Sequence, residues 1–139
     1  MLQLRLLVCR LTIWGLVGLG VLLIVSQWTE LKTHTEAVPL VSTVTFLALS
    51  GVAFNWARLD EALVMPHEKR IAKQAGVDLF MASMLALVTQ GLLWAAPVFI
   101  KPTPLLSQGL VLAHTMLLGV AILMAWLPIR RLLLLAGGR

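Results

Sequence analysis

Charged residues are scarce in this sequence, and its long apolar stretches contain none. Only 12% of the 139 residues are Asp, Glu, Lys or Arg, whereas 60% are hydrophobic, and the mean hydropathy is +0.95. A soluble domain carries about 25% charged residues, and a domain this small would lack the polar side chains to cover its surface. The composition therefore predicts an integral membrane protein surrounded mainly by lipid.

Cysteine and catalytic motifs are equally sparse. Cys9 is the single cysteine of the chain, so no internal disulfide is possible. The sequence has no HExxH pattern, no cysteine pair, no phosphate-binding glycine loop and no nucleophile constellation. The net charge of +5 is placed at the ends of apolar runs and not on a basic face. We therefore expect neither an enzyme, nor a metal site, nor a nucleic-acid partner.

Four uncharged runs organise the chain, at residues 11–28, 38–57, 79–100 and 105–127. A helix needs about 20 apolar residues to cross a hydrocarbon core of about 30 Å, so each run predicts one transmembrane helix. The predicted fold is a single all-α transmembrane domain over residues 1–139, built as two helical hairpins.

The polar connector at residues 58–78 joins the hairpins and holds eight of the seventeen charged residues. We expect a short amphipathic surface helix from Pro66 to Ala75, because proline favours helix starts and Gly76 would follow its end.

Two prolines are expected to affect the helices of the second hairpin. Pro97 is expected to end the third span early, and Pro128 to close or kink the fourth. The four leucines at 132–135 either extend the fourth helix or lie flat on the membrane surface.

Basic residues predict the orientation. Nine of the eleven lysines and arginines lie at the chain ends or in the connector, and only Lys32 and Lys101 lie on the opposite side. Short loops rich in Lys and Arg stay cytoplasmic. Both termini and the connector are therefore expected on the cytoplasmic side of a bacterial inner or thylakoid-type membrane. The tryptophans, which prefer membrane boundaries, all fall near predicted span ends and are interpreted as interface anchors: Trp14, Trp28, Trp56, Trp94 and Trp126.

A weak internal similarity leaves two explanations open. Residues 22–27 read LLIVSQ and residues 85–90 read LALVTQ, and Trp56 and Trp126 close the second helix of each hairpin. The hairpins are either a duplication related by an axis along the membrane normal, or a coincidence between low-complexity apolar segments.

His114 is the one ionisable residue deep in a span. It could bind haem or chlorophyll through its ring nitrogen, or contact a quinone. A haem with two histidine ligands would need a second histidine at the same depth, but His34 and His67 lie in loops. The simpler interpretation is a neutral histidine hydrogen-bonded to Thr89 or Gln90 on another helix.

Uncharged polar and small residues predict how the helices contact one another. Gln90, Thr89 and Asn55 are expected to form polar contacts between helices, since an unsatisfied amide is costly in hydrocarbon. Small residues spaced by four allow close helix approach, and they occur at Ala53/Ala57, Ala82/Ala86, Gly91/Ala95 and Ala121/Ala125.

Three functions fit these observations. The first is a small non-catalytic subunit, with a scaffold, assembly or interface role, that binds other integral membrane subunits through its span faces and connector 58–78. It needs no cofactor. The second is a subunit that contacts haem, chlorophyll or quinone through His114 in an electron-transfer or photosynthetic complex. The third is a small oligomeric transporter or channel whose path is lined by Gln90, Thr89, Asn55 and His114. Ion-coupled transport is disfavoured, because no acidic or basic residue lies within a span.

Overall fold

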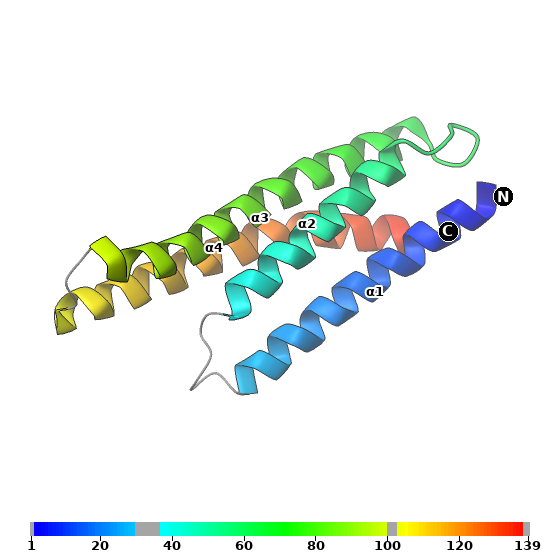
Figure 1. Cartoon of the computed structure of the whole chain (residues 1–139). Helices are drawn as coiled ribbons and strands as arrows, with labels where there is room; N and C mark the ends of the chain where they lie inside the picture. Colours follow the sequence, from blue (N-terminus) through cyan, green and yellow to red (C-terminus); the bar gives the residue numbers. More distant parts are fainter. Residues whose placement is uncertain (1, 30–36, 100–102, 138–139) are drawn as a thin grey trace.

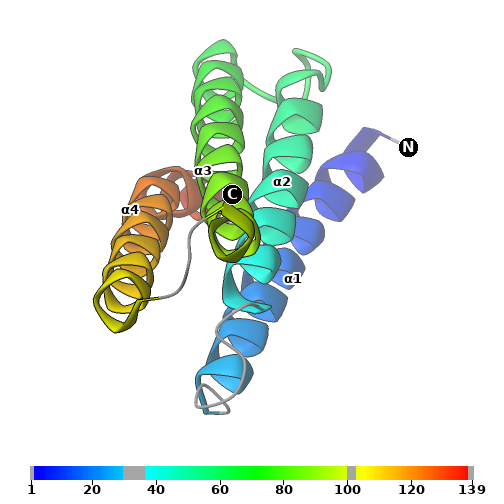
Figure 2. The same cartoon turned by 60° about the vertical axis from the view of Figure 1, so that its left-hand side comes forward.

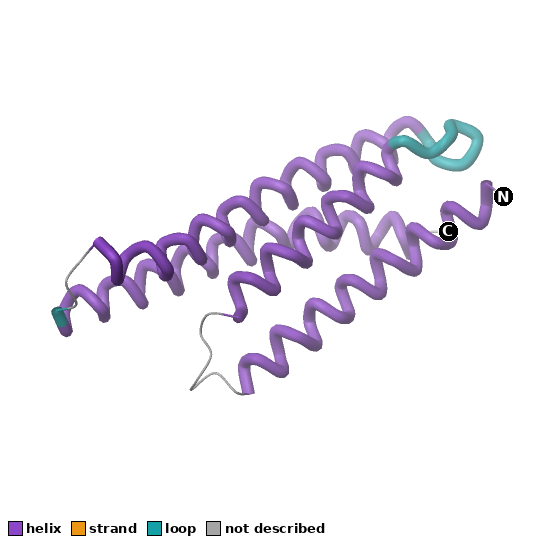
Figure 3. Tube along the Cα trace, viewed as in Figure 1, coloured by secondary structure: helices purple, strands orange, loops and turns teal. Residues whose placement is uncertain are grey.

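The chain folds into four long helices. The computed structural model describes residues 2–29, 37–99 and 103–137. Within them lie α1 (Leu2–Thr29), α2 (Ala37–Ala57), α3 (Pro66–Phe99) and α4 (Pro104–Gly137), and no strand occurs in this part of the chain. Each helix contains a segment long and apolar enough to cross a membrane. The predicted all-helical membrane fold with four candidate spans is confirmed (Figures 1 and 3).

The helices lie side by side in chain order. Helix α3 contacts α2 most extensively and α4 next, and α1 packs mainly on α2. Figure 2 shows α3 between α4 and α2, with α1 on the far side of α2. The start of α1, the turn after α2 and the end of α4 gather at one end of the bundle (Figure 1). We call this the charged end, because it holds most of the basic residues.

Helix α3 begins at Pro66, as predicted, and local hydrogen bonds explain why. The Met65 backbone N–H donates to the Glu68 carboxylate at 2.9 Å, and the Lys69 N–H donates to the Met65 carbonyl at 3.1 Å. A glutamate three residues after the cap satisfies a backbone donor that the helix leaves free. Proline at the first helical position loses no hydrogen bond.

The predicted surface helix and third span prove to be one helix of 34 residues. The predicted end at Gly76 is wrong, because this glycine lies buried against α2. The Ser50 hydroxyl donates to the Gly76 carbonyl at 2.7 Å, and a Cβ at Gly76 would stand 3.2 Å from the Phe54 ring. No described glycine has a positive φ. Gly76 therefore allows close packing between helices and does not end the helix.

Neither Pro97 nor Pro128 ends its helix, so the early end expected at Pro97 is wrong, as is the first of the two alternatives, closing or kinking, for Pro128. Helix α3 passes Pro97 and reaches Phe99, and α4 passes Pro128 and continues to Gly137. Of the two alternatives for the terminal leucines, the structure shows the extension. Leu132 is fully buried and Ala136 is 5% exposed, so packing holds this last part of α4.

Helix lengths exceed what a bilayer core requires. At 1.5 Å per residue, the 34 residues of α3 and of α4 span about 51 Å, and the 21 residues of α2 about 32 Å. The part of α3 that exceeds the thickness of the bilayer core lies at the charged end, where Lys69, Arg70 and Lys73 occupy its first turns. The polar connector is therefore part of the helical bundle.

Candidate functional site

His114 is buried within the bundle. Its side chain is 7% exposed, and its Nε2 atom has no hydrogen-bond partner among the described residues. It lies on α4, which contacts α3 more than any other helix. The fully buried Thr89 donates its hydroxyl to the Leu85 carbonyl of its own helix at 2.8 Å. The Thr89 hydroxyl proton is therefore used within α3, and the imidazole Nε2 of His114 remains available for another group.

A second histidine does not reach the depth of His114 among the described residues. His67 is exposed in the first turn of α3, and His34 lies outside the described residues. No group of three or more His, Cys, Asp or Glu side chains suited to a metal ion occurs in the part of the chain that the structure describes.

Asn55 lies far along the bundle from the other predicted polar residues. Its neighbour Phe54 contacts Gly76, and Gly76 precedes Gln90 by 14 residues of α3, or roughly 21 Å. Thr89 and Gln90 are buried together on α3, whereas Asn55 is exposed at the charged end. The structure therefore does not bring together the four residues expected to line a transport path.

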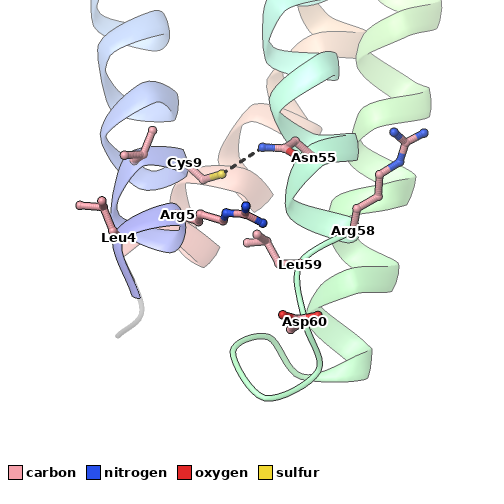
Figure 4. A pocket seen from close by; sticks show the side chains of 8 residues that line it. Leu4, Arg5, Cys9, Asn55, Arg58, Leu59 and Asp60 are labelled. Atoms are coloured by element: carbon pink, nitrogen blue, oxygen red, sulfur yellow. Dashed lines mark hydrogen bonds between the residues drawn. The ribbon is translucent and has the colours of Figure 1, made fainter. Parts of the chain in front are cut away.

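A pocket opens between α1 and the end of α2, and sequence reasoning did not find it. It has a volume of about 480 Å³ and is lined by Leu4, Arg5, Val8, Cys9, Asn55, Arg58, Leu59 and Asp60. The Asn55 amide contacts the Cys9 thiol at 3.5 Å, which joins the two helices at the base of the pocket (Figure 4). We call this cavity the α1–α2 pocket.

Two guanidinium groups belong to the α1–α2 pocket. Figure 4 shows Arg5 reaching from α1 toward the end of α2, whereas Arg58 extends away from α1. Asp60, in the turn that follows α2, is the one acidic lining residue. Both arginines are exposed. The arrangement suits an anionic group better than a cation, because the lining holds two arginines and one carboxylate.

The basic residues are the one signal for this pocket in the sequence, and the same residues predict the orientation of the chain. Arg5 and Arg58 both mark the predicted cytoplasmic side, and nothing in their spacing relates residues 53 positions apart. The packing of α1 on α2 brings them to the same cavity.

The tryptophans divide into two groups. Trp14, Trp94 and Trp126 are between 52% and 64% exposed, as an anchor in contact with lipid requires. Trp56 is only 1% exposed, and its indole Nε1 has no hydrogen-bond partner among the described residues. Its ring contacts protein and not lipid, so Trp56 belongs to the core. Trp28 lies where side-chain surroundings are not described.

Three of the four small-residue pairs face into the protein. Ala82/Ala86 and Ala121/Ala125 are fully buried, and Ala53 is buried with Ala57 half-buried. Only Gly91/Ala95 faces outward. The internal pairs therefore serve packing within this chain.

Helix α1 carries small residues on its outer side that this chain does not use. Gly15 and Gly18 are exposed, and no atom of the rest of the protein lies within 4 Å of where their Cβ atoms would stand. Leu11 and Leu22, one turn before and after them, are 64% and 69% exposed. These four residues share one side of the helix, which we call the outward face of α1.

Comparison with known proteins adds no assignment, since no family model, curated protein or solved structure matches this chain. The function must be inferred from the residues themselves.

Proposed function

We propose that this chain is a small non-catalytic subunit of a larger membrane protein complex, with a scaffold, assembly or interface role. The observation that carries the proposal is the outward face of α1. Only 17% of the membrane-spanning segment of α1 is buried within the chain, about as little as the 18% of α4 and less than the 39% of α2 and the 44% of α3. Its exposed glycines make that face concave and suited to a transmembrane helix of another subunit.

Glycine is a poor choice for a helix surface that meets only lipid. It costs roughly 1 kcal/mol of helix stability relative to alanine, and contact with lipid does not offset this loss. Between helices, in contrast, small residues let the backbones approach closely and gain van der Waals contact. Gly15 and Gly18 thus favour a protein partner for α1.

The proposed location is a bacterial inner or thylakoid-type membrane, with both termini and the connector on the cytoplasmic side. The excess of basic residues at the charged end supports this orientation. The exposed first turns of α3, with Lys73 and the hydrogen-bonded pair Gln74 and Asp78, would then offer a polar contact for a cytoplasmic partner.

The test places a photo-crosslinking amino acid at Gly18 in the native membrane. We expect a crosslink to one distinct integral membrane protein, and loss of its co-purification with Gly18→Leu. The control is Ala113→Leu, which enlarges an exposed residue of α4 that is not a glycine and should retain the partner. A crosslink to a second copy of this chain alone, or to lipid alone, would contradict the proposal.

His114 supports a second candidate, a subunit that contacts haem, chlorophyll or quinone. Its buried Nε2 atom without a partner is the observation in its favour, because a buried imidazole nitrogen normally has a ligand or hydrogen bond. An absorption spectrum and a quinone extraction of the purified complex, with and without His114→Ala, decide the question. A colourless, quinone-free preparation would reject this candidate and leave the first intact.

A further inference from the structure

We infer that the α1–α2 pocket binds the phosphate group of an anionic phospholipid. The site lies at the charged end of the bundle, where helices α1 and α2 enter the apolar layer. It goes beyond the proposed subunit role, which rests on Gly15 and Gly18 farther along α1.

The volume and charge of the pocket fit a lipid headgroup. Ligand sites measure about 300–1,000 Å³, and this pocket measures about 480 Å³. Two arginines and one aspartate leave one net positive charge in its lining. Guanidinium groups bind phosphate through paired N–H donors, and the Asn55 amide supplies a further polar group at the base.

The two arginines have separate parts in this site. Arg5 already extends between α1 and the end of α2 (Figure 4). Arg58 points away from α1 but is exposed, and exposed side chains change rotamer within nanoseconds. A phosphate held by Arg5 would attract the Arg58 guanidinium toward it.

The wall of the pocket continues into an apolar surface that suits acyl chains. Leu4 and Val8, which line the pocket, are 62% and 51% exposed. A bound lipid would place its phosphate beside Arg5 and its chains along these residues. Basic pockets between helices on the cytoplasmic side bind anionic headgroups in this manner.

The experiment measures lipid binding to the full chain by native mass spectrometry after delipidation in mild detergent. Dioleoylphosphatidylglycerol is titrated against dioleoylphosphatidylcholine. We expect the anionic lipid to bind about fivefold more tightly, as one effective charge near a phosphate would give. Arg5→Gln should remove this preference, and Arg58→Gln should reduce it.

Two matched variants separate this site from general attraction to a basic surface. Arg70→Gln removes the same charge from α3 outside the pocket and should leave the preference within twofold. Asp60→Asn removes the acidic lining residue and should strengthen binding of the anionic lipid, whereas Glu61→Gln, beside it but outside the lining, should not. Because Asp60→Asn is expected to increase binding of the anionic lipid, whereas Arg5→Gln is expected to decrease it, the test stays valid even if Arg5→Gln folds poorly.

Three results would overturn the inference: equal binding of both lipids, equal losses in Arg5→Gln and Arg70→Gln, or no gain in Asp60→Asn. The last measurement is competition between inorganic phosphate and the anionic lipid. If millimolar phosphate displaces the anionic lipid, the pocket binds a free anion and the assignment to a lipid is wrong.

Discussion

The α2–α3 pair and helix α1 are held in the bundle in different ways. Along α3, Ala72, Ala75 and Ala82 are fully buried, and Gly76 lies against the Phe54 ring of α2. Helix α1 packs mainly on α2, with Ile13 fully buried and with contacts where Gly20 meets Thr45 and Cys9 meets Asn55. This protein therefore has a closely packed α2–α3 centre and two helices, α1 and α4, whose membrane-spanning segments stay largely unburied.

The physical reason lies in the solvent. Lipid tails are as apolar as leucine, so burying an apolar side chain between helices gains little by itself. Close approach and hydrogen bonds remain, and the α2–α3 pair has both, at Gly76 and at the Ser50 hydroxyl. Helix α1 has one close approach at Gly20 and one hydrogen bond at Cys9, but its membrane-spanning segment stays largely unburied, and its exposed glycines are the reason we assign it to a partner.

Gly76→Leu should break the α2–α3 pair most severely. The new side chain would meet the Phe54 ring at 3.2 Å from its first carbon, and overpacking costs up to about 3 kcal/mol. Urea unfolding in detergent, followed by tryptophan fluorescence, measures the loss. Gly15→Leu on α1 is the matched control and should change stability little, because nothing lies near it. Phe54→Ala should restore part of the loss in the double variant, and its failure would mean that another contact is decisive.

Leu79→Ala tests packing in the same pair without adding volume. Leu79 is fully buried, and its truncation leaves a cavity. The usual cost of such a truncation has a transfer term and a cavity term. Because the unfolded chain also meets apolar surroundings in the membrane, only the cavity term remains, and we expect a loss of about 1.5 kcal/mol in the free energy of unfolding. The comparison variant is Leu123→Ala, which is 73% exposed and should be near neutral. Equal losses of stability in the two variants would mean that Leu79 is no better packed than the exposed Leu123.

Ser50→Ala removes the hydrogen bond between α2 and α3. Such interhelical bonds contribute about 0.6 kcal/mol in membrane proteins, and the bond to Gly76 is 2.7 Å long. The same unfolding assay should resolve this loss. Thr12→Val is the control, since the Thr12 hydroxyl bonds to the Val8 carbonyl of its own helix. A larger effect at Thr12 than at Ser50 would contradict the difference drawn between the two regions.

Glu68→Ala should have the smallest effect and act at the start of α3. It removes the acceptor for the Met65 N–H and a negative charge near a helix N-terminus, together about 0.5 kcal/mol. Hydrogen exchange at the first turn of α3 should quicken, with little change at the exposed α1 glycines. Glu61→Ala, in the preceding turn, is the control. Unchanged exchange in Glu68→Ala would show that the cap does not hold this helix start.

Sequence reasoning succeeded where a property depends on neighbouring residues. The four spans follow from uncharged runs, and the start of α3 follows from Pro66, because helices and their starts are local. It failed at Gly76, where the same residue type either ends a helix or admits a neighbour. It also failed for Trp56, whose place near a span end did not reveal that its ring faces the core.

Among the candidate sites, the sequence alone singles out His114, because it is the one ionisable residue deep in a predicted span. That its side chain is buried depends on helix packing, which only the structure shows. The α1–α2 pocket could not be found this way. Arg5 and Arg58 belong to different helices, and their relation depends on how those helices cross.

The amino-acid sequence by itself determined that this protein has four apolar helices with its basic residues gathered toward one end. Hydropathy and helix starts are properties of short segments, and hydrocarbon forces such segments to satisfy their own backbone hydrogen bonds. Only the tertiary structure decided which glycines admit a neighbouring helix, which tryptophan enters the core and which arginines share a pocket. Those outcomes depend on contacts between residues far apart in the chain, and in lipid such contacts are selected by shape and hydrogen bonding, since hydrophobicity is the same on every side.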